Sequence, residues 1–287
     1  MYITKMFLLR CFSYLPLGLL YAISDVLAWF AQNILRYRRK VILANLQRAF
    51  PEKTNEEYRE IMKKFYRNLS DVLVESLKAI TISEKAMRER ITVSGVELMK
   101  KYYQQHSSII ALAAHQANWE CLLLGGCLYL DSSIDAVYKP LTNQKFDKLM
   151  YAIRSRFGGR PVAMKHIFRE IIRRKKEVRT YALVADQSPA LHEAKVWVNF
   201  MGIESPFFVG PQKIAHATGY PVVFAGMRRL RRGYYEIVFL PLAEPPYSSD
   251  GWEVIEKYAE CMEKFIRENP ADWLWSHRRW KHAKSTS

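Results

Sequence analysis

The sequence predicts an α/β fold: a mixed, mainly parallel sheet flanked by helices, with an N-terminal helical membrane-anchoring region. From about residue 107, short apolar runs of strand length alternate with longer segments of helical periodicity, an alternation typical of α/β domains. A nearly uncharged stretch close to the N-terminus predicts the anchoring region. We therefore expect an anchor or interfacial helices at residues 1–36, a helical region at 37–106 and an α/β domain at 107–287.

Composition and charge limit the possible partners. A chain of 287 residues with 49% hydrophobic and 13% aromatic residues can build a full core and is not expected to be disordered. Its 44 Lys and Arg against 28 Asp and Glu give a net charge of +16, which favours an anionic partner such as nucleic acid, a bilayer surface or an acidic carrier protein. The four cysteines lack CxxC or zinc spacing, as expected of reduced thiols in a cytosol-facing protein.

Residues 11–35 contain a single charge, Asp25. A stretch of this length can span a bilayer, lie in its interface as an amphipathic helix, or form a buried helical hairpin of a soluble protein. Lys5 and Arg10 precede the run, and basic residues at 36–40 follow it. Those flanks favour membrane attachment with the following part on the cytoplasmic side. No small-residue cleavage site follows the charged start, so a cleaved signal peptide is not expected.

The next elements are predicted from periodicity. Residues 53–80 have helical spacing, and Thr54 with Glu57 forms a capping-box pattern at the start. The expected strands are 108–114, 133–138, 180–185, 195–200, 221–227 and 234–240. The expected later helices are 118–130, 143–157, 166–176, 210–218 and 252–268.

The stretch "AAHQANWE" (113–120) directly follows a buried strand pattern. Residues five apart on a helix point about 140° away from each other, so His115 can meet Glu120 only from the loop before the helix. Glu120 would then bond one imidazole nitrogen and leave the other free as a general base. No serine or cysteine adjoins His115, so the proton would come from a substrate hydroxyl, by direct transfer. In the alternative interpretation, His115 is only a hydrogen-bonded polar residue at the end of a strand, and Glu120 is an acidic residue favoured at the start of a helix by the helix dipole.

The string "HQANWE" resembles the His-x4-Asp/Glu signature of glycerolipid acyltransferases, in the form found in the late acyltransferases of lipid A biosynthesis. Four further stretches are similar to that family in order along the chain. They are "YRRKVILANLQRAFPE" (37–52), "VYKPLTNQKFDKLMYAIRSRFG" (137–158), "DQSP" (186–189) and "DWLWSHRRWK" (272–281). Asn143-Gln144 departs from the family's Asn-Pro, and residues 188–208 match more loosely, which leaves the acceptor open.

The resemblance implies a function and a location. Members of the family move a fatty acyl chain from a thioester, usually on acyl carrier protein, to a hydroxyl of a lipid acceptor, without a metal or other cofactor. Residues 107–287 would then be the catalytic domain, at the cytoplasmic face of a bacterial inner membrane. The acceptor would be a lipid A precursor, while a lysophospholipid, aminolipid or glycolipid remains open. No nucleic acid is expected as a partner.

The resemblance also assigns roles to individual residues. His115 would be the general base and Glu120 its partner. Arg154 or Arg156 would stabilise the oxyanion or hold an acceptor phosphate. Asn118 would pin the loop, and Asp186 and Gln187 would have either a supporting or acceptor-binding role or only bond loop amides.

A competing hypothesis from another class is a basic protein that binds nucleic acid or anionic membrane without catalysis. The runs "RRKKEVR" (173–179) and "RRLRR" (228–232) are compatible with solvated charge, or with docking to headgroups or to a carrier protein. No RNA- or DNA-binding motif is found in the sequence. In the C-terminal motif we expect Trp273, Trp275 and Trp280 to pack on the domain and His277 to be a hydrogen-bonded structural residue.

Overall fold

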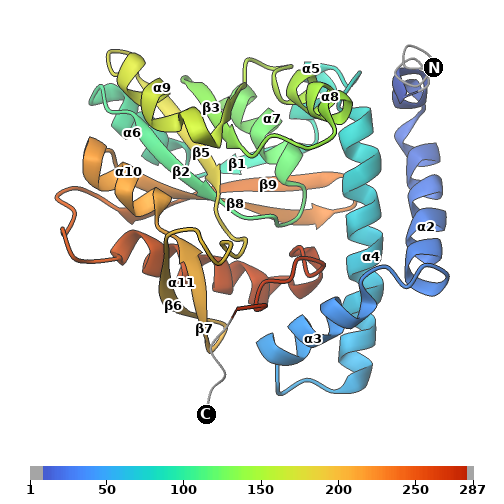
Figure 1. The fold of residues 1–287 in the computed structure, drawn as a ribbon. Helices are drawn as coiled ribbons and strands as arrows, with labels where there is room; N and C mark the ends of the chain where they lie inside the picture. Colours follow the sequence, from blue (N-terminus) through green and yellow to red (C-terminus); the bar gives the residue numbers. More distant parts are fainter. Residues whose placement is uncertain (1–8, 283–287) are drawn as a thin grey trace.

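A computed structural model describes residues 9–282, so Lys5 and the ends of the predicted anchor and catalytic domain lie outside the described residues. Helices and strands alternate along most of the chain (Figure 1). The helices are α2 (Leu17–Asn33), α3 (Arg39–Ala49), α4 (Asn55–Lys78), α5 (Glu84–Arg88), α6 (Val96–Gln104), α7 (Trp119–Tyr129), α8 (Gln144–Arg154), α9 (Ile167–Arg173), α10 (Gly210–Thr218) and α11 (Glu253–Glu268). The strands are β1 (Ile91–Ser94), β2 (Ile109–Ala113), β3 (Ser133–Tyr138), β4 (Arg160–Ala163), β5 (Arg179–Val184), β6 (Lys195–Phe200), β7 (Ile203–Phe208), β8 (Val222–Arg231) and β9 (Tyr234–Ala243).

The main sheet has seven strands in the order β1-β9-β8-β2-β5-β3-β4. Strands β8, β2, β5, β3 and β4 are parallel to one another, whereas β9 pairs antiparallel with β8 and parallel with β1. The sheet is therefore mixed and mainly parallel, as predicted. The carboxyl ends of β2 and β5 lie at the same edge, because parallel neighbours run in the same direction.

Strand β2 is buried along its whole length, and it separates two cores. Ile110 and Leu112 belong to one hydrophobic cluster, and Ile109 and Ala111 to another, because successive strand residues point to opposite faces. Helices α5 to α8 contribute to the second cluster, whereas α3, α9, α10 and α11 contribute to the first. Covering both faces explains the continuous apolar run that preceded the histidine motif.

Most expected elements are confirmed within a few residues, including the capping box of α4 formed by Thr54 and Glu57. Three strands were not predicted: β1, β4 and β7. Strands β1 and β4 are four residues long and lie at the sheet edges, and β4 contains Pro161, a residue that edge positions tolerate. Because β1 pairs with β9, the region 37–106 is not only helical but contributes a strand to the main sheet.

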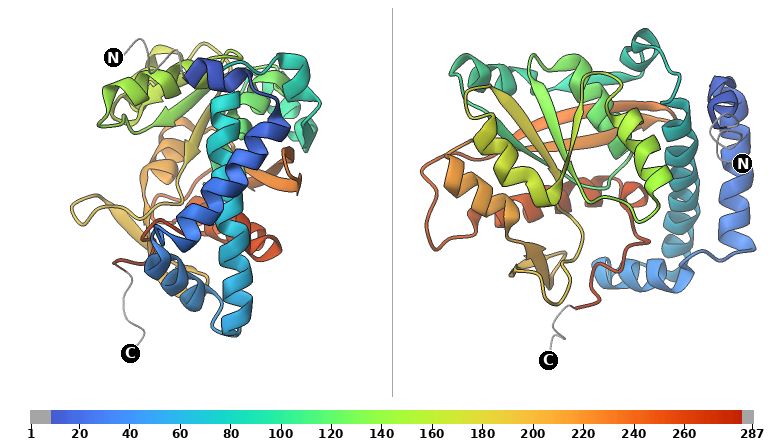
Figure 2. Two further views of the ribbon diagram at one scale, coloured as in Figure 1. Left: turned by 90° about the vertical axis from the view of Figure 1, so that its right-hand side faces the viewer. Right: turned by 45° about the horizontal axis from the view of Figure 1, so that its top comes forward.

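The N-terminal region packs alongside the rest of the molecule. Helix α2 lies against the long helix α4, at the side of the domain where β8 ends and β9 begins (Figures 1 and 2). Pro16 separates α2 from the helical residues 9–14. Within residues 9–282, no helix is long and apolar enough to cross a membrane, so the membrane-spanning interpretation of residues 11–35 is not confirmed.

Strands β6 and β7 form a separate antiparallel hairpin that projects away from the main sheet (Figure 1). The C-terminal segment 273–280 packs against this hairpin. Trp280 stacks on Phe200 and donates a hydrogen bond to Ser205, and Trp273 meets Phe200 edge to face. Trp273, Trp275 and Trp280 are all buried, as predicted from the C-terminal motif.

Candidate active site

His115 lies in the loop between β2 and α7, as the sequence predicts. Its Nδ1 is 2.6 Å from Oδ1 of Asp186, and its backbone N–H donates to Oδ2 of the same carboxylate at 3.0 Å. Asp186 follows β5, the strand next to β2, so two adjacent strand ends bring the pair together. With Nδ1 facing a carboxylate, the proton belongs on Nδ1 and Nε2 is left as the basic nitrogen.

Asp186 is 2% exposed and takes a further hydrogen bond from Nε1 of Trp273 at 2.9 Å. Burial alone would raise the pKa of Asp186, but the charge of His115 and the bonds from His115 and Trp273 lower it below its ordinary value. Burial acts in the opposite direction on His115, whose pKa is nevertheless raised by the charge and hydrogen bond of Asp186. The pair therefore favours aspartate with an imidazole that binds a proton readily.

Glu120 does not hold His115 in this structure, which corrects the predicted His115–Glu120 hydrogen bond. Both Glu120 carboxylate oxygens accept from Arg154, from Nε at 2.9 Å and from Nη2 at 2.6 Å. Glu120 lies in the first turn of α7 and Arg154 at the end of α8, so the bidentate pair joins two neighbouring helices. Glu120 is close enough to His115 for its charge to help raise the pKa of the imidazole.

The two arginines of the "R-x-R" pattern have different positions. Arg154 lies beside the site, with its guanidinium carbon 5.8 Å from the ring centre of Tyr138 at the end of β3. Arg156 instead donates to the backbone carbonyl of Ala79, just after α4, and lies over the ring of Phe157. Arg154 therefore lies at the site, whereas Arg156 is bound elsewhere, at the end of α4.

Asn118 is the N-cap of α7 and is fully buried. Its Oδ1 accepts from the backbone N–H of Cys121 at 3.0 Å, so it fixes the start of the helix that follows the histidine loop. Its Nδ2 donates to Glu75 of α4 at 2.5 Å, a contact that the sequence did not indicate. Gln187 is half-buried and makes no hydrogen bond through its side chain to any residue between 9 and 282.

Residues 272–274 hold the histidine loop through hydrogen bonds of the backbone. The N–H of Leu274 donates to the carbonyl of His115, and the N–H of Ala117 donates to the carbonyl of Asp272. Ala117 has a φ of +49°, a conformation that costs energy for a residue with a side chain and recurs at functional sites. The Asp272–Leu274 segment therefore contributes both a side chain, Trp273, and the backbone contacts that fix the loop.

Two of the sequence motifs meet at this segment. Asn45, from the 37–52 motif, donates from Nδ2 to the carbonyls of Trp275 and His277, both at 2.8 Å. The ring of His277 accepts from the backbone N–H of Ser188, two residues after Asp186. His277 is therefore a hydrogen-bonded structural residue, as predicted, and burial lowers its pKa to about 4. The motifs at 37–52, 113–120, 186–189 and 272–281 converge on one site.

Most arginines of the two basic runs form ion pairs within the protein. In "RRLRR", Arg229 forms an ion pair with Asp272, and Arg232 contacts Asp71 and Asp25. In "RRKKEVR", Arg179 is buried against Asp135. These side chains hold elements together, so the runs are not simply solvated charge.

Sequence reasoning left the role of Asp186 undecided and did not connect Trp273 or Glu75 with the site. Asp186 had two signals, because it follows an apolar strand pattern and lies in the family stretch "DQSP" (186–189). Trp273 lies in the family stretch at 272–281, but nothing in the sequence paired it with Asp186. Glu75 had no signal, and both contacts join segments more than forty residues apart in the chain. The resulting arrangement can take a proton at Nε2 of His115 and hold the resulting imidazolium beside Asp186.

The chain is similar to known proteins over nearly its whole length. The family model described as bacterial lipid A biosynthesis acyltransferase matches residues 1–282. A lipid A biosynthesis lauroyltransferase of Escherichia coli K12 is 25% identical over 271 residues, covering 93% of this chain and 87% of that protein. A lipid A biosynthesis palmitoleoyltransferase of the same organism is 23% identical over 269 residues, covering 93% of this chain and 86% of that protein.

Proposed function

The chain belongs to the bacterial lipid A biosynthesis acyltransferase family, and from that premise we propose that it transfers a fatty acyl chain from acyl carrier protein to a hydroxyl of a lipid A precursor. The observation that carries the proposal is the His115–Asp186 pair. It occupies Nδ1 and leaves Nε2 as the base, within the loop that carries the family motif. His115 is 20% exposed at its side chain, so a substrate can reach it.

In the proposed mechanism, Nε2 of His115 removes the proton of the acceptor hydroxyl while that oxygen attacks the thioester carbonyl. The C–O bond forms, and the tetrahedral intermediate then breaks its C–S bond. The departing thiolate takes the proton back from the imidazolium. Asp186 keeps the imidazole in the required tautomer and stabilises the imidazolium, so this proposal gives it the orienting role first expected of Glu120.

Glu120 and Arg154 have a different role in this proposal. Arg154 uses Nε and Nη2 for Glu120, and its Nη1 bonds to no residue in the described part of the chain. We assign this free edge to the oxyanion or to a phosphate of the acceptor, because a charged donor beside a developing negative charge lowers the barrier. Glu120 fixes the direction of that guanidinium.

The proposed place of action is the cytoplasmic surface of the bacterial inner membrane. Large apolar side chains on the outer side of α2 are exposed, and the basic segment 36–40 directly follows that helix. The exposed side chains include Leu19, Val26, Leu27, Trp29 and Phe30. Apolar residues beside exposed arginines suit an anionic bilayer surface, where each basic residue contributes about 1 kcal/mol. The lipid acceptor would reach His115 from that surface.

The test is an acyl-transfer assay with labelled acyl–acyl carrier protein, using a lipid A precursor and, in parallel, a lysophospholipid as acceptors. We expect transfer to the lipid A precursor by the wild type and none by His115→Ala. Transfer to the lysophospholipid alone would keep the chemistry and change the acceptor. Undiminished transfer by His115→Ala would overturn the mechanism. Salt-dependent binding to polyanions without any transfer would favour the non-catalytic binding protein.

A further inference from the structure

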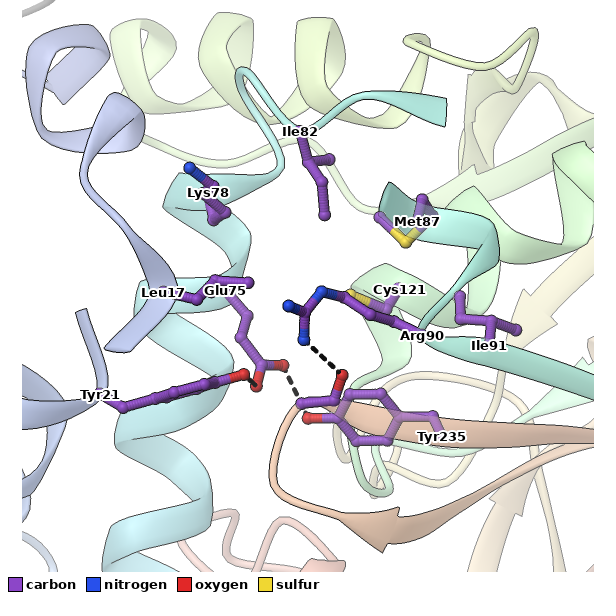
Figure 3. A pocket seen from close by; sticks show the side chains of 11 residues that line it. Leu17, Tyr21, Glu75, Lys78, Ile82, Met87, Arg90, Ile91, Cys121 and Tyr235 are labelled. Carbon is purple, nitrogen blue, oxygen red and sulfur yellow. Dashed lines mark hydrogen bonds between the residues drawn. The ribbon is translucent and has the colours of Figure 1, made fainter. Parts of the chain in front are cut away.

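A buried carboxylate outside the histidine motif contacts the start of the catalytic helix. Glu75 of α4 is 6% exposed and accepts three hydrogen bonds. Asn118 donates at 2.5 Å and Tyr235 at 2.6 Å to one oxygen, and Tyr21 donates at 2.9 Å to the other. Figure 3 shows Glu75 at the wall of a small pocket, between Tyr21 of α2 and Tyr235 of β9.

Glu75 is connected to the histidine loop through Asn118, whose side chain makes two hydrogen bonds. Asn118 caps α7 with its Oδ1 and holds Glu75 with its Nδ2. A side-chain amide can make both contacts only in one orientation, because the oxygen must face the Cys121 N–H and the nitrogen must face the carboxylate. Glu75 therefore selects the orientation in which Asn118 caps the helix that carries Glu120.

The loop next to Asn118 needs such support. Ala117 has a positive φ, and its N–H donates a hydrogen bond to the carbonyl of Asp272. Arg229 of β8 connects the two supports, since it donates to the hydroxyl of Tyr235 at 3.0 Å and to Asp272 at 2.9 Å. A strained loop keeps its conformation only where the surroundings determine it from several directions.

We propose that Glu75 is a positioning residue for catalysis, which acts through Asn118 to hold the His115 loop and the start of α7 in the reactive geometry. This inference rests on the proposed acyltransferase function. Removing the carboxylate frees the Asn118 side chain, and small displacements of reacting groups lower kcat by about 10- to 100-fold.

A matched control lies one turn earlier on the same helix. Asp71 is also buried, but its shortest contacts are with Ser24 and Arg232, away from the histidine loop, and Arg229 is 3.9 Å away. Glu75→Met and Asp71→Leu both remove a buried carboxylate from α4. We expect both variants to lower the melting temperature, and only Glu75→Met to lower kcat, with KM unchanged.

The experiment measures kcat and KM of the full-length protein in Glu75→Met, Glu75→Gln, Asn118→Ala and the Glu75→Met/Asn118→Ala double variant. Glu75→Gln keeps an acceptor for Asn118 and should restore kcat to within severalfold of the wild type. The double variant should lose no more activity than the worse single variant, because both act on one contact. Losses that multiply in the double variant, or an equal loss of kcat in Asp71→Leu, would overturn the inference.

A second measurement separates this inference from the proposed function. Hydrogen exchange of the backbone amides at residues 116–122 should be faster in Glu75→Met than in Asp71→Leu. If the wild type transfers no acyl chain, the proposed function fails, and faster exchange in Glu75→Met alone still supports the positioning role. Equal exchange in the two variants would contradict it.

Discussion

Two acidic side chains flank the histidine loop, and they are bound in different ways. Asp186 holds His115, a partner that gains and loses a proton near neutral pH, and both its oxygens contact that residue. Glu120 holds Arg154, a partner that stays charged at all accessible pH values. The first pair can take part in proton transfer, whereas the second provides a fixed charge and fixed geometry. The motif carboxylate and the histidine's partner are thus separate residues.

Replacing the histidine itself should have the largest effect on acyl-transfer activity. His115→Ala removes the base, and we expect acyl transfer to fall to background, with substrate binding retained. His115→Gln is the matched control, since it keeps a polar side chain of similar size but cannot take a proton at neutral pH. Steady-state assays with both acceptors test this. Substantial activity in His115→Gln would show that the base lies elsewhere.

The next largest effect is expected at Asp186. Asp186→Asn keeps the shape of the side chain but favours the wrong imidazole tautomer, and loss of such an orienting carboxylate lowers kcat by about 10³- to 10⁴-fold. The matched variant Glu120→Gln should cost less, about 10- to 100-fold, because it disturbs only the placement of Arg154. Comparing kcat of the two variants decides which acid orients the base. A larger loss in Glu120→Gln would instead make Glu120 the residue that orients His115.

The pH dependence sharpens the same distinction. A base must be neutral to act, and the pKa of His115 is raised above 6.5, since the charge and hydrogen bond of Asp186 outweigh the effect of burial. Activity should therefore increase with pH through an apparent pKa above 6.5. In Asp186→Asn the midpoint of the pH profile of the residual activity should move to lower pH. Burial then lowers the pKa of His115 without the opposing effect of the carboxylate. Profiles of kcat/KM measure both, and an unchanged midpoint in Asp186→Asn would contradict the pairing.

The smallest effect is expected at His277, which lies near the pair but does not titrate with it. Burial lowers its pKa to about 4, so between pH 6.5 and 4 the unfolded chain binds a proton that the folded protein does not. Stability is therefore lost as the pH falls through this range. His277→Gln can still accept from Ser188 and should show a smaller decrease in melting temperature on acidification. An identical decrease would exclude this contribution.

The sequence determined much of this protein by itself. Hydrophobic periodicity predicted the α/β class, the helix at 53–80 and strands such as β3 and β6, because these patterns express which face of each element is buried. The turn after β2 was predicted from the buried apolar run that ends at the histidine motif, and helix geometry excluded His115 and Glu120 from sharing a helical face. The order of the five motifs indicated the family.

Only the tertiary structure decided which residues meet. Asp186 follows β5, Trp273 lies in the C-terminal segment and Glu75 lies in α4, and no local pattern records which strand ends or helices become neighbours. Glu120 was assigned to His115 because they are close in sequence, yet α8 brings Arg154 to it instead. Local sequence determines elements through propensity and burial, whereas partners across the sheet follow from strand order and packing, which depend on the whole chain.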